Sequence, residues 1–486
     1  MSLRRAIRAS LLALLVLTVV PAVLFAHGAL KSSSPARGAV LARTPAALYL
    51  TFTEQVELAV ARVVLVRNAN DTIQLSPLRA DSGGRTLVAD LSDPRVANLS
   101  GDSVTYTIHW LITGKDGHPV RGSIPFTVLA DGLVANDPAA GNAGLRADTL
   151  RDTANVHAHD STSSPAAIGD STSGTVAGGI FASNGAVQTF TRWVGFAAFF
   201  TAIGAVCSLV AVAPALARQG RSSFAQSLAR RCNFAGLFAA GVLLIVEVCR
   251  LVLQHHALSS ESISLSYASI LGSTTWGTAW MVRALSLVML LFALLLARRS
   301  VGALRRVGLV TSVVAMAGIA TGMSLSGHAA AVQSRTTAIL YDAAHVLSAG
   351  AWIGTLALVL LVTLPLLRSD AATALIAVRS FSVVAMGAVA LMLASGVLSA
   401  LNHVGTFDAL WNSNYGKVLL FKVAIALVVM LLGARNQLRL RNDRVSGTDR
   451  VNSIARVGRI ELLAALGVLL LTAILVATPT PPSALH

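Results

Sequence analysis

The chain has 486 residues, of which 54% are hydrophobic and 12% are charged. Soluble globular domains carry about 25% charged residues, so this composition excludes an ordinary soluble protein and indicates a membrane protein. The formal net charge of +16 does not indicate a nucleic-acid partner, because most arginines lie in short segments between apolar runs, where they act as topology signals.

The first 26 residues are predicted to be a secretory signal peptide. They begin with three arginines within eight positions, continue with an apolar stretch at 11–20 and end on Ala26, directly before His27. This order is typical of a segment that is removed on export. Cleavage after Ala26 would place Leu24 three positions before the cut, where a small residue is more usual, so a retained anchor helix is the alternative.

Residues 27–129 are predicted to form an exported β domain. Short alternating segments separated by turn residues favour a small antiparallel sandwich or barrel. In the fourth segment the period of two places Tyr106 and Trp110 on the buried face and His109 on the exposed face. The predicted strands are 47–56, 61–66, 86–91, 103–112 and 123–129.

Residues 130–186 are rich in Ala, Gly, Ser, Thr and Asp without an apolar period, which predicts a flexible linker. For the "HAHD" at 157–160 within it, a solvated linker is preferred over a loosely held metal. The three cysteines, Cys207, Cys232 and Cys249, come later in the chain. Because their spacing matches no zinc or redox motif, we expect them to pack as small apolar side chains.

Residues 187–478 are predicted to be a membrane domain of eight helices, followed by a short exterior tail at 479–486. Runs of about 20 apolar residues are enough to cross a bilayer of roughly 30 Å. Arginines are concentrated in alternate loops, so the β domain and both ends of the membrane domain are expected outside. The predicted spans are 190–214, 233–254, 277–297, 307–326, 341–366, 381–400, 415–434 and 460–477.

Spans three and seven begin alike, with an aromatic-Gly pair and a basic residue six places after the glycine, Arg283 and Lys422. Four spans separate them, which predicts a parallel four-plus-four duplication. Charges inside a membrane need partners. Glu247 and Arg250 are three residues apart and are expected to neutralise each other, whereas Arg283 and Lys422 are expected to snorkel to the outer headgroups.

All eleven histidines fall in the exported part, in outer loops or at outer helix ends of this topology. Imidazole is the commonest side-chain metal ligand, so the distribution favours a ligand set that faces the exterior. The alternative is that the inner loops are short and rich in arginine.

The turn "ITGKDGHPVRG" at 112–122 carries two metal ligands, Asp116 and His118. If the signal is cut after Ala26, His27 becomes the terminal residue and offers its α-amine and its imidazole to one metal. Together with the other two side chains this makes three nitrogens and one hard oxygen, which suits tetragonal Cu(II). The exported domain contains neither methionine nor cysteine, the soft ligands that select Cu(I).

Three segments of the exported part resemble the periplasmic copper-binding protein CopC, and the membrane part resembles its partner CopD. The resemblance implies an all-β Greek-key sandwich of the immunoglobulin or cupredoxin type, followed by an all-α polytopic membrane domain. It also implies that His27, Asp116 and His118 are Cu(II) ligands. Some CopC proteins carry a methionine-rich Cu(I) site as well, and this chain departs from that pattern. The three segments are "HGALKSSSPARGAVL" (27–41), "LYLTFTEQV" (48–56) and "DGHPVRGSIPFTV" (116–128).

The CopD-like part contains "SGHAAA" and "YDAAHVLSAGAWIG". His328 ends the fourth span and His345 opens the fifth, where Asp342 lies three residues earlier on the same helix face. Met323 offers a thioether at the same level. We therefore predict an outer-facing copper site from Met323, His328, Asp342 and His345. The alternative is that these side chains cap and pack the helix ends.

These observations predict a copper-handling protein of the bacterial inner membrane, with its N-terminal domain in the periplasm. It is expected to bind Cu(II) outside and to import or transfer copper, in copper homeostasis or resistance. Copper, the lipid bilayer and periplasmic copper chaperones or cuproenzymes are the expected partners. No phosphate-binding loop and no Cys-Pro-Cys helix is present, so we do not expect ATP as a partner. Neither a nucleic-acid partner nor an enzymatic activity is expected. The alternatives are sequestration or delivery of copper without transport, and a haem-binding membrane redox protein.

Overall fold

The computed structural model describes residues 30–68, 71–81, 83–92, 96, 103–115, 117, 119–129, 183–259, 265–299, 302–327, 335–404, 411, 414–440 and 447–476. These residues divide into two compact units, one built of strands and one built of helices, and each is described by itself. The predicted signal peptide, nearly all of the predicted linker and the exterior tail lie outside the described residues.

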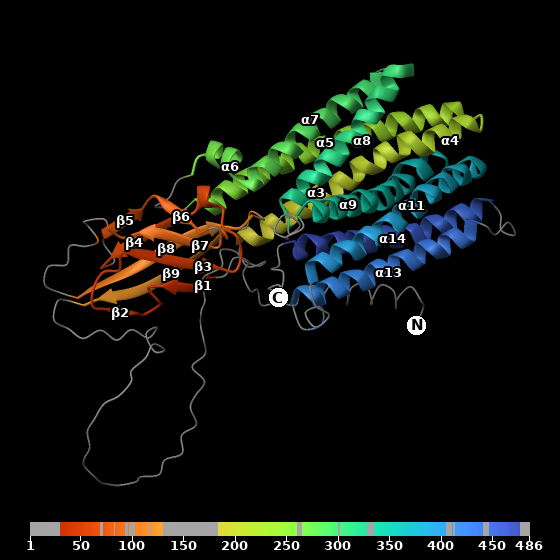
Figure 1. The fold of residues 1–486 in the computed structure, drawn as a ribbon. Coiled ribbons are helices and arrows are strands. Elements are labelled where there is room, and N and C mark those ends of the chain that lie inside the picture. The colour runs from red at the N-terminus through yellow and green to blue at the C-terminus, as the bar shows by residue number, and fades with distance from the viewer. Residues whose placement is uncertain are drawn as a thin grey trace, which may run out of the picture. The chain divides into compact units, whose positions relative to one another are not determined.

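The described strands form two sheets (Figure 1). One sheet has the order β1-β3-β7-β6 and the other has the order β2-β9-β8-β4-β5. The sheets pack face to face, since the rings of Phe52 and Trp110, one from each sheet, are 5.1 Å apart in an edge-on contact. The strands are β1 Leu30–Ser34, β2 Val40–Leu41, β3 Ala47–Phe52, β4 Arg62–Arg67, β5 Asp71–Leu75, β6 Leu78–Ala80, β7 Thr86–Asp90, β8 Val104–Thr113 and β9 Pro119–Val128.

Strand β8 confirms the predicted alternation. Tyr106, Ile108 and Trp110 are buried, and His109 between them is exposed. The Tyr106 hydroxyl donates a hydrogen bond of 3.0 Å to the Val96 carbonyl, which satisfies its polar end inside the core. The all-β sandwich expected for this part of the chain is therefore confirmed.

The sequence did not predict four of the strands, β1, β2, β5 and β6. Each of them is the edge strand of its sheet. An edge strand is short and half solvated, so it carries few apolar residues and shows little alternation. Central strands can be recognised in the sequence because they lie between two strands and against the opposite sheet, so they carry more buried apolar side chains.

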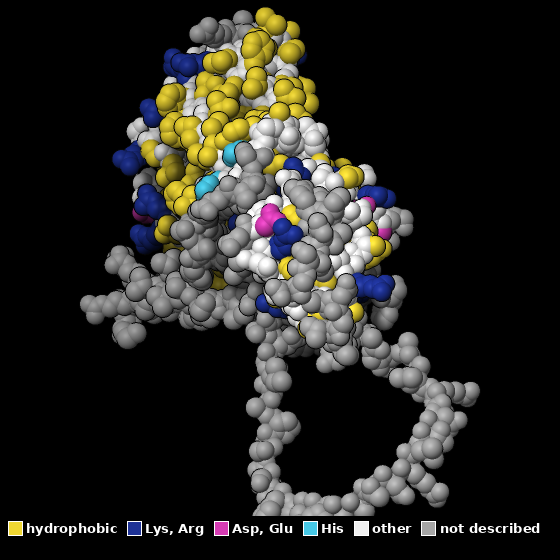
Figure 2. All heavy atoms as spheres, turned by 90° about the vertical axis from the view of Figure 1, so that its left-hand side faces the viewer, with side chains coloured by type: hydrophobic (Ala, Val, Ile, Leu, Met, Phe, Trp, Pro, Cys, Tyr) yellow, Lys and Arg dark blue, Asp and Glu magenta, His cyan; other side chains and the backbone are white. Residues whose placement is uncertain are grey.

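The described residues include eight helices that are long and apolar enough to cross a membrane, as predicted (Figure 1). Hydrophobic side chains cover much of the helical surface that Figure 2 shows. The exposed side chains of these helices include Phe238, Leu285 and Phe292. The helical elements are α3 Ser183–Cys207, η2 Ser208–Val212, α4 Ala213–Arg218, α5 Ser222–Leu258, α6 Tyr267–Ser273, α7 Thr275–Arg299, α8 Gly302–Leu325, α9 Arg335–Leu358, η4 Val359–Thr363, α10 Leu364–Leu366, α11 Ala371–Val404, α13 Asn414–Leu440 and α14 Gly447–Leu475.

Three helices, α5, α11 and α14, begin about ten residues before the apolar runs that predicted them. The added N-terminal turns contain arginine, alanine and other good helix formers, so each helix begins before its hydrophobic pattern does. A hydropathy pattern reports the apolar length of a span and not the end of its hydrogen bonding. The predicted N-terminal boundaries of these three spans were therefore wrong.

The first and fifth spans contain the same irregularity. In each, one π-helical turn, η2 or η4, is followed directly by a short helix whose second residue is proline, Pro214 or Pro365. Proline lacks the backbone N–H that an α-helix would use, and the π turn changes the hydrogen bonding just before it. The two spans are four apart, which agrees with the predicted four-plus-four duplication.

Helices α3 and α9 pack with their backbones in contact. A Cβ added at Gly354 would overlap the carbonyl group of Phe200, and one added at Gly204 would overlap the backbone of Gly354. Gly354→Ala is therefore expected to push the two helices apart and to destabilise the helical unit by about 1–3 kcal/mol, measured as a lower unfolding temperature of the purified protein in detergent.

The matched control is Gly241→Ala on α5, where an added Cβ meets nothing within 4 Å. Alanine has the higher helix propensity, so this variant is expected to be as stable as the parent or more stable. Equal unfolding temperatures for Gly354→Ala and the parent would show that the α3–α9 contact is not a tight one.

Candidate metal centre

The predicted Cu(II) ligands of the exported part, His27, Asp116 and His118, lie outside the described residues. The strands on either side of this turn are described. Strand β8 ends at Thr113, β9 begins at Pro119, and the two strands are neighbours in one sheet. Gly117 has a φ of 82°, a conformation that glycine adopts without strain. The "DGH" segment therefore falls in the five-residue connection between two adjacent strands, and of its three residues only Gly117 is described.

The predicted outer-facing site has three members among the described residues. Met323 lies on the last turn of α8, and Asp342 and His345 lie half-buried on the first turns of α9. Helices α8 and α9 pack against each other. The fourth member, His328, lies outside the described residues, and within the described part of the chain no group of three or more His, Cys, Asp or Glu side chains is placed to hold a metal.

The imidazole of His345 is fixed by helix α11. Its Nδ1 lies 3.0 Å from the carbonyl oxygen of Met392, and a Cβ added at Gly396 would be 3.1 Å from the ring, so α11 packs closely against it. A carbonyl oxygen only accepts, so Nδ1 must carry the proton in this hydrogen bond. The neutral ring then has its lone pair on Nε2, which is the arrangement common among metal-binding histidines.

A cation from a distant helix completes this cluster. Lys422 of α13 is half-buried and interacts electrostatically with Asp342, and both interact with His345. Sequence reasoning did not group Lys422 with Asp342, because 80 positions separate them in the chain. The one available signal was the internal repeat, which singled out Lys422 as a basic residue inside a span.

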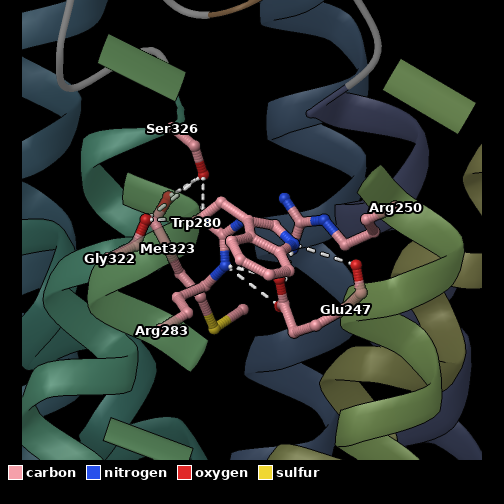
Figure 3. Close-up of polar contacts among 7 residues, drawn as sticks. All are labelled: Glu247, Arg250, Trp280, Arg283, Gly322, Met323 and Ser326. Atoms are coloured by element: carbon pink, nitrogen blue, oxygen red, sulfur yellow. Dashed lines mark hydrogen bonds and ion pairs between the residues drawn. The ribbon is translucent and has the colours of Figure 1, made fainter. Parts of the chain in front are cut away.

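A second group of buried charges lies between α5, α7 and the end of α8 (Figure 3). Arg283 of α7 is only 1% exposed. Its Nε donates to both carboxylate oxygens of Glu247 on α5, at 3.0 and 3.1 Å. Its Nη1 donates to the Gly322 carbonyl at 2.9 Å and to the Ser326 hydroxyl at 2.8 Å. The prediction that Arg283 snorkels to the headgroups was therefore wrong.

The end of α8 explains why Arg283 stays inside. The last four carbonyl groups of a helix have no partner within the helix, and Gly322 supplies one of them because α8 ends at Leu325. An added Cβ at Gly322 would be 2.6 Å from Cγ of Arg283, so this glycine also makes room for the arginine. Arg283 thus fixes the helical turn that carries Met323.

The predicted pairing of Glu247 with Arg250 is present but weak. The distance from Arg250 Nη1 to Glu247 Oε1 is 3.7 Å, and the Arg250 side chain is 20% exposed. The indole N–H of Trp280 donates to the Glu247 carbonyl at 2.9 Å, which ties α7 to α5 next to the ion pair. Spacing along one helix suggested Arg250, whereas the packing of α7 against α5 brings Arg283 closer.

Comparison with known families matches three parts of the chain. Residues 30–129 match the CopC domain, residues 183–338 match the family described as copper resistance protein D-like, N-terminal domain, and residues 375–475 match the family described as copper resistance protein D. The three matched ranges together span both the strands and the helices of the structure.

Individual relatives agree with these matches. The copper transport protein CutJ of Bacillus subtilis is 26% identical over 96% of this chain and 77% of its own length. Copper resistance protein C of Pseudomonas syringae pv. tomato is 34% identical over 23% of this chain and 86% of its own. The crystal structure of CopC from Methylosinus trichosporium OB3b aligns with 22% of this chain and 99% of that chain, at 22% identity and a TM-score of 0.19. On the three family matches, the chain belongs to the copper resistance family, as a CopC domain and a multi-pass CopD membrane domain in one polypeptide.

Proposed function

We propose that this protein captures Cu(II) on the outer side of the bacterial inner membrane and carries copper inward through its helical unit. The observation that carries the proposal is His345, whose Nδ1 is bound to the Met392 carbonyl so that Nε2 remains available to a metal. It lies beside Asp342 on the first turns of a membrane span. We take the metal to be copper because both matched domains belong to copper resistance families.

The first step of this proposal is capture by the exported domain. His27, Asp116 and His118 bind Cu(II) through an α-amine, two imidazoles and a carboxylate, if the chain is cut after Ala26. This set needs no soft ligand, and the domain contains none. Copper chaperones and exported cuproenzymes are the proposed exchange partners on that side.

The second step is transfer to the outer-facing site, where Met323, His328, Asp342 and His345 offer one thioether, two imidazoles and one carboxylate. Mixed soft and borderline ligands suit copper in either oxidation state. Lys422 lies near the carboxylate of Asp342 and competes electrostatically with a bound cation, which favours release over storage. We propose transport for this reason, with no enzymatic reaction and no use of ATP.

The orientation follows from the arginine-rich loops. The connection after the first span and the connection after the fifth span lie on the same side, because Arg221 Nη1 is 3.1 Å from Asp370 Oδ2. The backbone N–H and the hydroxyl of Thr373, together with Arg221, lower the pKa of the Asp370 carboxyl, so the acidic partner of this ion pair is ionised at neutral pH. We propose that this side faces the cytoplasm, as the positive-inside rule requires.

Copper accumulation in cells tests both the site and transport. The double variant His328→Ala/His345→Ala is expected to lower copper uptake at least about tenfold, since changes around a metal ligand alone already cost 10–100-fold. The matched control is His256→Ala, which removes an exposed imidazole at the end of α5 and leaves the proposed ligands intact.

Uptake by the double variant equal to that of the parent would rule out the outer-facing site. A parent protein that protects cells from copper without raising their copper content would instead support sequestration.

A further inference from the structure

One ionisable group of the helical unit has no part in the copper sites described above. Glu461 lies near the middle of the span Thr448–Leu475 on α14 and is only 2% exposed. An ionised carboxylate in apolar surroundings is costly unless it is paired, so buried acids inside a membrane are usually functional. The identity of its partners therefore decides what Glu461 does.

The partner of Glu461 is a neutral amide. Asn436 of α13 donates from Nδ2 to Glu461 Oε1 at 2.7 Å and also reaches the Ile454 carbonyl at 3.4 Å. Gly433, one turn earlier on α13, also lies next to the carboxylate, since a Cβ added there would be 3.7 Å from Glu461 Oε2. Among the ion pairs of the described residues, none includes Glu461.

The charged groups on the surrounding elements do not compensate Glu461. Helix α14 packs against α13, α3, α11 and α9. Arg450 is on the buried face of α14 but three turns earlier, which is about 16 Å along the helix, and Arg379, Arg435, Arg456 and Arg459 are exposed. The remaining charged and titratable side chains that the structure describes on these helices are Arg192 and Cys207 on α3, Arg335, Tyr341, Asp342 and His345 on α9, Lys417 and Lys422 on α13, and Asp449 on α14.

The amide of Asn436 suits a group that gains and loses a proton. Its Oδ1 is buried without a hydrogen-bond partner, although the side chain is 9% exposed and Nδ2 is bonded. The two ends of an amide have nearly the same shape, so a half-turn exchanges donor and acceptor. The ionised carboxylate accepts from Nδ2, and the neutral acid donates its O–H to Oδ1. Both protonation states of Glu461 are therefore satisfied by one partner.

A metal cation fits these surroundings less well. Hard cations such as Ca²⁺ take six to eight oxygen ligands. The oxygens gathered here are the Glu461 carboxylate, the Asn436 amide oxygen and the Ile454 carbonyl. A proton requires only one donor and one acceptor, which this pair supplies.

Glu461 is also connected to the helix that carries the proposed copper ligands. Gly458, one turn earlier on the same face of α14, rests on η4, where an added Cβ would be 3.1 Å from Leu360. The π turn η4 continues α9, on which Asp342 and His345 lie. A shift of α14 caused by a change of charge at Glu461 would therefore be passed through this contact to the irregular part of α9.

We propose that Glu461 is a proton-binding site and that copper movement through the helical unit is linked to proton movement. The carboxylate takes up one proton from one side of the membrane and becomes the neutral acid. The same O–H bond breaks when the proton leaves toward the other side of the membrane. The link to copper rests on the proposed transport function. Proton binding at Glu461 does not depend on it, so the two are tested separately.

Proton binding is measured on the purified full-length protein by infrared spectroscopy. The parent is expected to show the carbonyl band of a protonated carboxylic acid in an apolar setting, which disappears as the pH is raised. In Glu461→Gln that band is expected to be missing, whereas the control Asp449→Asn, at the exposed end of the same helix, retains it. A difference spectrum without such a band would overturn the proposal even if copper transport is found.

Coupling is measured as copper uptake into vesicles that contain the full-length protein. A gradient of one pH unit is expected to change the initial rate by up to about tenfold for one coupled proton. Glu461→Gln is expected to respond to a copper gradient but not to a pH gradient, and Asp449→Asn is expected to respond to both.

A Glu461→Gln protein that keeps the full response to pH would contradict coupling through this residue, and a response to a sodium gradient alone would identify the wrong ion. Vesicles without any copper uptake would contradict transport while the infrared result stands.

Discussion

A form of the protein that begins one residue before His27 is expected to bind Cu(II) at its exported domain at least about 100-fold more weakly than the form that begins at His27. Even changes beyond the ligands of a metal site cost 10–100-fold in affinity, and this change removes a direct nitrogen ligand and its chelate ring. The α-amine then belongs to the added residue, and His27 retains only its imidazole. Asp116 and His118 would form a weak pair on a surface turn.

This prediction is checked by competition titration with a Cu(II) chelator and by the EPR spectrum of the loaded protein. The spectrum is expected to change from a nitrogen-rich tetragonal signal to one with fewer nitrogens. His109→Ala is the matched control, because it removes an exposed histidine of the same domain that lies on β8. An affinity that is unchanged by the added residue would show that the terminal amine is not a ligand.

The second large effect is expected at the buried ion pair. Arg283→Met should destabilise the helical unit by about 3–5 kcal/mol, because it leaves the Glu247 carboxylate buried without its main partner. The Gly322 carbonyl and the Ser326 hydroxyl lose a donor in the same change. The measurement is the shift in unfolding temperature of the purified protein in detergent.

Two variants separate the ion pair from a general effect of charge. Arg283→Met/Glu247→Leu removes both charges, and most of the stability is expected to return, since a buried ion pair is often replaceable by apolar side chains of similar volume. Arg250→Met removes the more exposed and more distant arginine, 3.7 Å from Glu247, and is expected to cost less than about 1 kcal/mol. Equal losses for Arg283→Met and Arg250→Met would show that the contacts of Arg283 contribute no special stability.

Two buried acids among the described residues of the helical unit illustrate different uses of a carboxylate in a membrane. Glu247 is held by an arginine on a neighbouring helix and stabilises the packing of α5, α7 and the end of α8. Glu461 is held by an amide, which suits either protonation state. The first carboxylate is expected to keep its arginine partner throughout transport, and the second is expected to take up and release a proton.

The sequence by itself determined the parts of this protein that depend on pattern along the chain. The central strands, the outward direction of His109 and the eight spans follow from periods of two and from apolar runs, because each strand or helix must match its surroundings along its own length. The candidate ligands His27, Asp116, His118, Met323, His328, Asp342 and His345 were found by their residue types and by resemblance. The four edge strands and the first turns of α5, α11 and α14 carry no such pattern and were missed.

Only the tertiary structure decided which groups meet across elements. The pairs Glu247–Arg283, Asn436–Glu461 and His345–Met392 each join two helices, and in a bundle the rotation and depth of each helix decide such contacts. Local spacing favoured Arg250 for Glu247 and placed Arg283 at the headgroups, because a sequence shows neighbours along one helix and not those across a packed interface. The physical reason is that a buried polar group must form a hydrogen bond, and the partner is whichever suitable group lies nearest in space, wherever it lies in the chain.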